Sequence, residues 1–251
     1  MEIDIFKKQC EASVVKFKDR IGKFDYIANG ILLWEGLAFC SMLDMCGIDM
    51  IIESGVAGGA STEIWAKYFS GKIYAIDSSL FYGPERFAQT ADRLRKYTNV
   101  ELINGDSFFE MEKIIKKNLD KKIAIFIDGP KGKAAEVLAK KMFFYNNVIF
   151  AGIHDQNSRD GGHPMDGWEK SVFFTDSPWF VEKYSFLDRE LDSPLLEEQL
   201  KNKPGGLVIG FAENCGKKGS LIEINTSFYK EKIKSFLFSF LIGLKKRLFN
   251  D

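Results

Sequence analysis

Five acidic residues stand at or just beyond the ends of five apolar stretches that predict β-strands. These acids are Glu53, Asp77, Asp106, Asp128 and Asp155. The carboxyl ends of parallel strands meet at one edge of an α/β sheet, and ligands bind in the crevice beyond that edge. We therefore expect the five carboxylates to face one site. For Asp106 and Asp128, a helix N-cap is the competing interpretation.

A glycine-rich turn follows the first of these strands. The segment from Met50 to Asp77 has the pattern of strand, turn, helix and strand, and its turn contains the sequence ESGVAGGAST. Gly55, Gly58 and Gly59 carry no side chain, so the backbone can turn tightly there and a ligand can approach closely.

The helix after this turn begins with Ser61 and Thr62 in its first turn. Its free N–H groups point toward whatever the glycine loop holds. Asp77 closes the next strand 22 residues after Gly55 and is followed by Ser78. An acid at that place accepts the hydroxyls of a ribose. The whole unit predicts a nucleoside-binding site.

The spacing of the turn indicates which nucleoside. A dinucleotide fingerprint, GxGxxG, cradles a pyrophosphate, whereas this turn lacks the first glycine pair and has Glu53 just before it. A carboxylate repels a pyrophosphate and attracts an ammonium group. S-adenosylmethionine has an ammonium, a sulfonium and a ribose but no phosphate, and it is the expected cofactor. The alternative is a turn that only connects a strand to a helix.

At these residues the chain resembles the class I S-adenosylmethionine-dependent methyltransferases, whose first motif is an acidic residue before a glycine-rich turn. The resemblance covers roughly residues 48–155. It implies that Glu53 and Gly55 face the methionine amino group, that Asp77 binds the ribose, and that Asp106 and Ser107 contact the adenine.

The run IDGPKG, residues 127–132, is similar to the branch that contains macrocin O-methyltransferase and cephalosporin-hydroxylase-like proteins, as are residues 53–62 and the pair His154-Asp155. The resemblance to the superfamily places Asp128 beside the methyl-transfer centre, and oxygen is the expected methylated atom.

A hydroxyl acceptor must lose a proton, either to a general base or with the help of a metal. His154, with Asp155 beside it, is the expected catalytic base, and a hydrogen-bonded structural histidine is the alternative. Asp128 and Asp155 are also candidate ligands for Mg²⁺, which prefers oxygen ligands. The third ligand would come from the loop that follows, from Asn157, Asp160 or Asp166.

The order of the elements predicts an α/β fold. We expect a doubly wound, Rossmann-like methyltransferase sheet of five parallel strands plus an antiparallel edge hairpin, with an N-terminal helical cap and a C-terminal helix. The expected strands are 50–52, 73–76, 100–104, 122–127 and 148–153, with the hairpin at 180–186 and 207–212. The expected domains are the helical cap at 1–47, the S-adenosylmethionine-binding core at 48–215 and a basic amphipathic tail at 216–251.

Composition narrows the class of protein. The 251 residues include 35 basic and 35 acidic ones, so no nucleic-acid partner is expected. The four cysteines show no metal-binding spacing, which suits a reducing compartment. The N-terminus lacks the pattern of a signal peptide, and the apolar runs are too short to span a bilayer. The expected location is cytoplasmic, with peripheral contact to the inner membrane face through the tail.

Two further segments bear on the partners. Residues 156–170 have loop composition, with glycines and the side chains of His163 and Trp168, and predict a lid over a polar acceptor, such as a small hydroxylated molecule or a glycan precursor. Residues 230–249 are basic at both ends and apolar between, which is typical of a helix in a membrane interface. Packing on its own domain or in a homodimer is the alternative.

Two other functions fit the same pattern. Among the enzymes, the same nucleoside fold serves an aminopropyl transferase with a decarboxylated donor, or a non-methyltransferase role in the cephalosporin-hydroxylase-like branch. A non-catalytic nucleoside-binding or scaffold protein, tethered through its C-terminal helix, is the alternative outside the enzymes, although such a protein would be free to lose the strand-end carboxylates.

Overall fold

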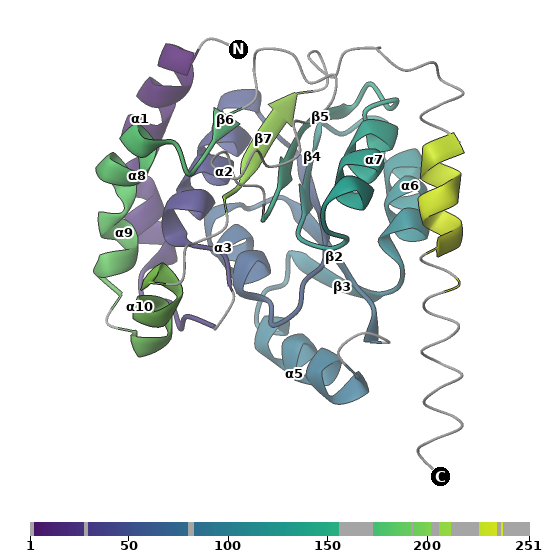
Figure 1. The fold of residues 1–251 in the computed structure, drawn as a ribbon, viewed down its shortest axis with the longest axis horizontal. Coiled ribbons are helices and arrows are strands. Elements are labelled where there is room, and N and C mark those ends of the chain that lie inside the picture. The colour runs from purple at the N-terminus through teal and green to yellow at the C-terminus, as the bar shows by residue number, and fades with distance from the viewer. Residues whose placement is uncertain are drawn as a thin grey trace.

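The computed structural model describes residues 3–27, 30–79, 83–155, 173–191, 193–201, 206–211, 226–234 and 237. Within these ranges the chain forms one seven-stranded sheet with helices packed on both faces (Figure 1). The predicted α/β fold class is confirmed.

The strands lie in the order β3-β2-β1-β4-β5-β7-β6. Strands β1 to β5 pair in parallel, and β7 pairs antiparallel with both β5 and β6, which is the expected sheet with its edge hairpin. The central strands β1 and β4 are buried along their whole length, because helices cover both faces. The strand bounds are β1 Met50–Ser54, β2 Lys72–Asp77, β3 Val100–Asn104, β4 Ile123–Ile127, β5 Val148–Ile153, β6 Phe173–Phe174 and β7 Val208–Phe211.

One strand of the hairpin differs from the prediction. The expected strand at 207–212 is observed as β7, but residues 180–186 are helical and belong mainly to α8 (Pro178–Tyr184). Pro178 is a favourable first residue for a helix, and Phe180 and Tyr184, four residues apart, bury one helical face. The hairpin partner of β7 is instead the two-residue strand β6.

Four helices connect the parallel strands in succession. The helices α6 and α7 cover one face of the sheet, while α3 packs on the other with the N-terminal helices (Figure 1). Their bounds are α3 Ala60–Tyr68, α5 Pro84–Leu94, α6 Ser107–Lys117 and α7 Lys133–Met142. Each begins just after a strand's carboxyl end, so all four N-termini lie at the edge where the acids were predicted to meet.

The N-terminal region forms two helices, α1 (Ile3–Ile21) and α2 (Leu33–Cys46). Gly22, at φ +52°, follows the end of α1. Every residue of α2 from Leu33 to Leu43 is buried, so this helix has no solvent-facing side over those turns. A helix that is apolar all round must be covered on every side. In this protein α1, α3 and the sheet supply that cover.

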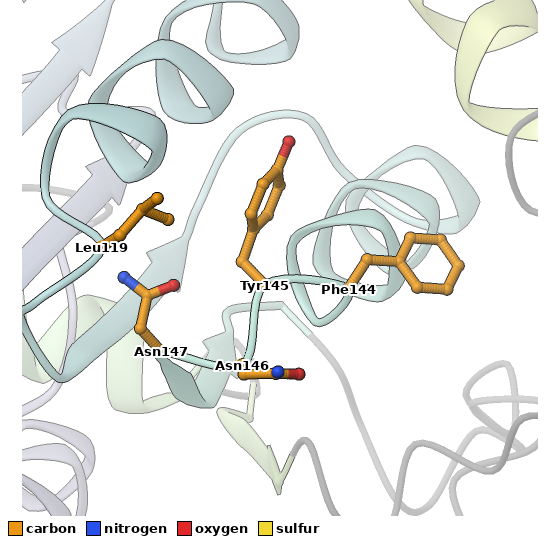
Figure 2. A pocket seen from close by; sticks show the side chains of 5 residues that line it. All are labelled: Leu119, Phe144, Tyr145, Asn146 and Asn147. Atoms are coloured by element: carbon orange, nitrogen blue, oxygen red, sulfur yellow. The ribbon is translucent and has the colours of Figure 1, made fainter.

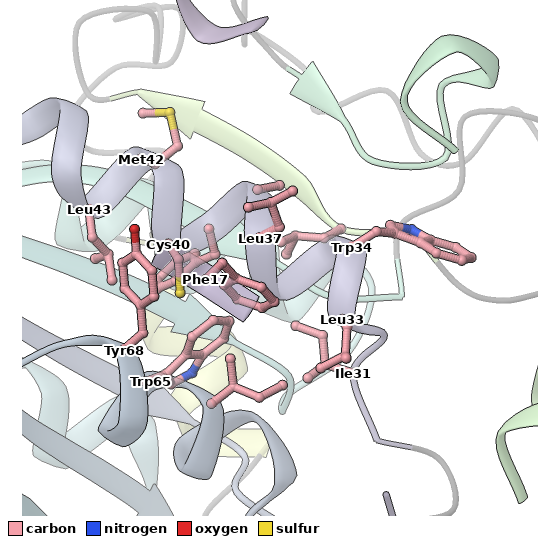
Figure 3. Close-up of a cluster of buried hydrophobic side chains, with 14 of the residues drawn as sticks. Phe17, Ile31, Leu33, Trp34, Leu37, Cys40, Met42, Leu43, Trp65 and Tyr68 are labelled. Carbon is pink, nitrogen blue, oxygen red and sulfur yellow. The ribbon is translucent and has the colours of Figure 1, made fainter. Parts of the chain in front are cut away.

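Aromatic rings fill the space between α2, α3 and the sheet. Phe39 of α2 lies 4.5 Å from the ring of Trp65, 5.3 Å from that of Phe126 and 5.2 Å from that of Phe150, measured between centroids. Figure 3 shows the neighbouring part of this core, where Phe17 of α1 and Tyr68 of α3 flank Trp65. The N-terminal helices and the β1–α3 unit therefore share one core.

The rest of the described chain is helical. The helices α8, α9 (Phe186–Arg189) and α10 (Pro194–Lys201) lie between β6 and β7 in the sequence. Residues 226–234 form a further helical segment beside α6 (Figure 1), held there by the buried ring of Phe228, 5.5 Å from the ring of Phe108. None of the helices in the described ranges has the length and apolar composition needed to cross a membrane.

The ends of β1 and β4 approach each other closely at Gly55. Ser54 O accepts hydrogen bonds from Asp128 N at 2.7 Å and from Gly129 N at 3.0 Å. A Cβ atom on Gly55, whose φ is +83°, would lie 2.3 Å from the backbone nitrogen of Gly129. Glycine is therefore required at this position by contact between two backbone segments.

We expect Gly55→Ala to destabilise the protein more than Gly47→Ala does. Both positions have positive φ, +83° and +59°, but a Cβ on Gly47 meets nothing within 4 Å. The backbone cost alone is about 1–2 kcal/mol, and a clash in a packed region adds about 1–3 kcal/mol. Urea denaturation should show the free energy of unfolding falling by about 2–5 kcal/mol for Gly55→Ala and by about 1–2 kcal/mol for Gly47→Ala. Equal losses would contradict the close approach.

Candidate functional site

The strand ends lie in register, so the five predicted carboxylates reach one edge of the sheet. Ser54 of β1 is level with Ile76 of β2 and Ile127 of β4, and Ile127 is level with Ile153 of β5. The acids do not form one cluster, however. Glu53 and Asp77 flank the glycine turn, Asp106 caps a helix, and Asp128 and Asp155 form a group with His154.

Asp77 holds the glycine turn in place. Its Oδ2 accepts hydrogen bonds from the backbone N–H groups of Val56, at 2.8 Å, and Ala57, and its Oδ1 accepts one from Ser78 N at 2.6 Å. A carboxylate has about four acceptor sites. The three backbone bonds leave room for about one ribose hydroxyl, whereas two were expected from the sequence. The ribose-binding role of Asp77, and a role for Ser78, stay predictions.

Glu53 is fully buried and joins β1 to the start of α3. Its carboxylate oxygens accept hydrogen bonds from Ser61 Oγ and, at 2.6 Å, from Thr62 Oγ1. Burial raises the pKa of Glu53 to about 8, and the two hydroxyls offset only part of that rise. Glu53 is therefore mostly protonated at pH 7, and its expected contact with an ammonium group stays a prediction. Ser61 and Thr62 direct their hydroxyls at Glu53.

The other two glycines of the turn have packing roles. Gly59 is the N-cap residue of α3 and favours glycine through its φ of +81°, while a Cβ there would make only an ordinary contact with Leu94 at 3.4 Å. A Cβ on Gly58 would lie 3.1 Å from the side chain of Ile27. Both positions therefore favour glycine for the shape of the turn, and their contact with a cofactor stays a prediction.

Asp106 is the N-cap residue of α6, where its Oδ1 accepts a hydrogen bond from Phe108 N at 2.8 Å. Asp106 therefore makes the N-cap contact that was the alternative to a cofactor-binding role. The next residue, Ser107, lies with its Oγ 2.6 Å from Ser54 Oγ, and Ser54 also contacts the carbonyl of Gly129. These contacts join the ends of β1 and β4 to the start of α6. Adenine contacts by Asp106 and Ser107 stay predictions.

Asp128 does not cap a helix, because α7 begins at Lys133 with Gly132 as its N-cap residue. Instead its Oδ1 lies 2.7 Å from His154 Nδ1 and also pairs with the ammonium of Lys131. The same lysine Nζ lies 2.5 Å from Asp155 Oδ2. The structure thus brings Asp128, His154 and Asp155 together, as predicted, and adds Lys131.

On its other side, His154 meets a carboxylate that the sequence did not point to. His154 Nε2 lies 3.3 Å from Oε2 of Glu35, a fully buried residue in the first turn of α2. Burial alone would lower the pKa of His154, but the charges and hydrogen bonds of Glu35 and Asp128 outweigh it and hold that pKa well above the ordinary value. The ring is therefore an imidazolium near neutral pH, and a catalytic base role would require it to give up that proton first.

The charge on Asp128 follows from the same contacts. Burial raises its pKa, but the hydrogen bond and charge of His154 and the charge of Lys131 outweigh burial and lower the pKa to about 2. Asp128 is therefore ionised throughout the physiological range. Asp155 is half exposed, with 49% of its side-chain surface accessible, while the His154 side chain is only 8% accessible. Of the two predicted catalytic residues, Asp155 is the one that an acceptor could reach.

A second acid that the sequence did not point to binds the start of the same helix. Asp188 of α9 accepts hydrogen bonds from the first N–H groups of α2, Leu33 N at 2.8 Å and Trp34 N at 3.2 Å. Glu35 Oε2 also accepts from Leu32 N at 2.9 Å, a contact that closes the start of the helix. The spacing of Leu32 and Glu35 is that of a capping box, but Leu32 has no hydroxyl, so no sequence motif singles out Glu35.

Several predicted features lie outside the described residues. These are the lid at 156–170, the third metal ligand expected among Asn157, Asp160 and Asp166, and all of the apolar tail run 236–244 except Leu237.

A surface depression of about 460 Å³ lies at the opposite edge of the sheet, where β4 and β5 begin. Figure 2 shows the side chains that line it, Leu119 and the run 144–147. The hydroxyl of Tyr145 donates to Glu112, and Asn147 Nδ2 donates to the carbonyls of Asn118 and Lys121. The polar groups of this depression are engaged in hydrogen bonds to neighbouring residues, and the predicted carboxylates lie at the other ends of the strands. We therefore place the candidate site at the carboxyl edge of the sheet.

No protein-family model matches this chain, and no curated protein matches its sequence. Solved structures of similar fold include the SAH-bound methyltransferase PaMTH1 of Podospora anserina, at 16% identity and TM-score 0.43, covering 83% of this chain and 94% of that one. An O-methyltransferase of Bacillus cereus in complex with SAH shows 13% identity and TM-score 0.37, over 81% and 90% of the two chains. Fibrillarin of Aeropyrum pernix with natively bound S-adenosyl-L-methionine shows 12% identity and TM-score 0.37, over 64% and 66%. Values this low carry no inference about activity.

We expect the wild-type protein to lose stability relative to Glu53→Gln as the pH rises from about 5 to 8. The folded pKa of Glu53, about 8, exceeds the value of about 4.3 expected in the unfolded chain. Its contribution to stability is therefore complete below about pH 4.3 and is lost as the pH rises through 8. The difference in free energy of unfolding between the wild type and Glu53→Gln should change by up to about 1.4 kcal/mol per pH unit, measured by urea denaturation.

The exposed acid Asp120, whose side chain is 74% accessible, provides the control. Asp120→Asn should follow the wild-type pH profile. If the pH profile of the free energy of unfolding of Glu53→Gln also runs parallel to that of the wild type, the prediction that Glu53 is buried in its protonated form is refuted.

Proposed function

We propose that this chain is an S-adenosylmethionine-dependent methyltransferase that methylates an oxygen of a small hydroxylated molecule or glycan precursor. The observation that carries the proposal is the arrangement around the end of β1. There the glycine turn, the N-terminus of α3, Glu53 and Asp77 lie together at the carboxyl edge of the sheet.

The residues at this place fit such a cofactor. Glu53 is a buried carboxyl whose described partners are two neutral hydroxyls, and its pKa of about 8 leaves it able to ionise beside an ammonium group. Asp77 retains about one acceptor site for a ribose hydroxyl. When bound, S-adenosylmethionine supplies a methyl group on a sulfonium. The role of the chain is to hold donor and acceptor in line, an effect that can be worth about 7–11 kcal/mol.

The acceptor would meet the cluster at the ends of β4 and β5. The Asp155 carboxylate is half exposed there, within reach of an acceptor, and we assign it the proton of the acceptor hydroxyl. His154, nearly enclosed and held between Glu35 and Asp128, orients Asp128. Asp155 therefore serves as proton acceptor, and His154 as a positioning residue.

We expect S-adenosylmethionine and S-adenosylhomocysteine to bind the wild-type protein with micromolar dissociation constants in calorimetric titrations. Asp77→Ala should weaken both by tenfold or more, about 1.4 kcal/mol, because it removes a hydrogen-bond acceptor and releases the turn that Asp77 holds. Asp120→Ala changes an exposed acid away from the site and should bind as the wild type does.

The same titrations separate the alternatives. Preference for a decarboxylated donor over S-adenosylmethionine would indicate aminopropyl transfer. An absence of binding to any of these nucleosides would refute the methyltransferase and favour a scaffold protein.

We also propose that the C-terminal segment contacts an anionic membrane surface, which would place the protein peripherally on the cytoplasmic face. Tyr229, Ile233 and Leu237 recur every four residues and are 55%, 58% and 51% exposed. Buried Phe228 attaches the helix to α6. Lys230 and Lys234 stand beside the exposed apolar residues, with Lys234 paired to Glu231 at 2.6 Å, while Lys232 packs over the ring of Phe109. An apolar stripe bordered by lysines suits the interface of a bilayer with acidic lipids.

We expect the wild-type protein to sediment with vesicles of phosphatidylcholine and phosphatidylglycerol and to stay free of vesicles made of phosphatidylcholine alone. Ile233→Glu should reduce binding about tenfold or more, since burying an isoleucine is worth about 1.5–3 kcal/mol. Leu119→Glu, which changes an equally exposed apolar residue elsewhere (62%), is the control. A homodimer that Ile233→Glu dissociates, without vesicle binding, would contradict the membrane contact.

A further inference from the structure

A lysine ammonium lies between the two strand-end carboxylates. Lys131, in the turn after β4, places Nζ 2.5 Å from Asp155 Oδ2 and in an ion pair with Asp128 Oδ1. The lysine side chain is 51% accessible, so this ion pair faces the open side of the site. A cation of the chain's own therefore already joins the ends of β4 and β5.

The position is the one that a metal would take. Ligand atoms of Asp128, His154 and Asp155 all lie within 4.8 Å of one another, a spacing that could hold an ion. The sequence led us to expect Mg²⁺ between the two aspartates. In this arrangement a metal and the Lys131 ammonium would compete for the same two carboxylates, and two cations at so short a separation repel each other.

The remaining donors do not suit Mg²⁺. Asp128 Oδ1 already pairs with both Lys131 Nζ and His154 Nδ1, and His154 Nε2 is directed at Glu35. Mg²⁺ requires near-octahedral oxygen ligation at about 2.0–2.1 Å, whereas the third group here is a nitrogen with both ring atoms engaged. The described residues therefore do not fit a magnesium site.

We propose, building on the methyltransferase function above, that Lys131 takes the place of a divalent cation and that this chain orients its acceptor hydroxyl without a metal. An ammonium has three N–H donors. Two of them meet Asp128 and Asp155, and the third, which has no partner among the described residues, would bind the acceptor oxygen on the exposed side.

Such a contact stabilises the negative charge that develops on the acceptor oxygen. The oxygen–carbon bond forms while the carbon–sulfur bond breaks, the sulfur keeps the electron pair, and the hydroxyl proton passes to the Asp155 carboxylate. The lysine itself neither gains nor loses a proton.

Metal binding tests this role without any assay of activity. Free Mn²⁺ can be followed by electron paramagnetic resonance in titrations of wild type, Lys131→Met, Lys131→Arg and the double variant Lys131→Met/Asp155→Asn. We expect the wild type and Lys131→Arg to leave Mn²⁺ free. Lys131→Met should bind it at least tenfold more tightly than the wild type, because two carboxylates lose their cation, and the double variant should lose this gain.

Either of two results would overturn the proposal. One is stoichiometric Mn²⁺ binding by the wild type that Asp155→Asn abolishes. The other is a Lys131→Met protein that folds but gains no affinity for Mn²⁺. If Lys131→Met does not fold, Lys131→Gln replaces it, and the wild-type titration remains decisive by itself.

The outcome is separable from that of the proposed function. S-adenosylmethionine binds at the end of β1 in our proposal, so a failed nucleoside titration would refute methyl transfer and leave the Mn²⁺ results interpretable. Conversely, nucleoside binding by a wild type that also takes up Mn²⁺ would keep the methyltransferase and remove the role of Lys131. Lys131→Met should bind S-adenosylmethionine as the wild type does, which also reports its folding.

Discussion

A buried histidine between two carboxylates connects the two halves of this fold. His154, at the end of β5, meets Asp128 of the sheet on one side and Glu35 of the N-terminal helix α2 on the other. Taking charges out of water is costly, and removing one partner of such a group leaves another uncompensated. The position of α2 is therefore coupled to the charges at the strand ends. The helical cap is part of the site, and the acids on both sides of His154 are held in fixed places.

The neighbouring turn depends on backbone packing in the same way. The ends of β1 and β4 come so close at Gly55 that a side chain has no room there. Ser54 then contacts Ser107 and the Gly129 carbonyl, and the Asp77 carboxylate holds the turn from the other side. The cofactor side and the acceptor side of the candidate site thus share the short stretch from Ser54 to Gly55. A ligand that displaces the backbone on the cofactor side would therefore also displace the backbone on the acceptor side.

Much of this arrangement could be predicted from the sequence, because it depends on local patterns. Five apolar runs, each ending near an acid, placed the parallel strands and the edge at which their ends meet. The strand predicted at 180–186 was wrong, since a run containing Phe180 and Tyr184 fits either a buried strand or a helix with one apolar face. The pairing of His154 with Glu35 joins residues 119 positions apart. No local sequence pattern predicts this contact, because it forms only when α2 packs on the sheet. Lys131 was visible in the sequence, but its place between two aspartates depends on the turn after β4.

The complete burial of α2 also has a consequence for how the chain reaches its fold during synthesis. The helix is finished at residue 46, yet Asp188, which binds its first N–H groups, is made 142 residues later. At about 5–20 residues per second, a ribosome needs roughly 7–30 s to cover that distance. The strands β1 to β5 are complete by residue 153, but Phe173, Phe180 and Leu207 of the same core follow later, so this almost wholly apolar helix waits without its full cover. A nascent chain with such a segment is a natural client for chaperones that shield exposed apolar surface, and slowed elongation would prolong its exposure.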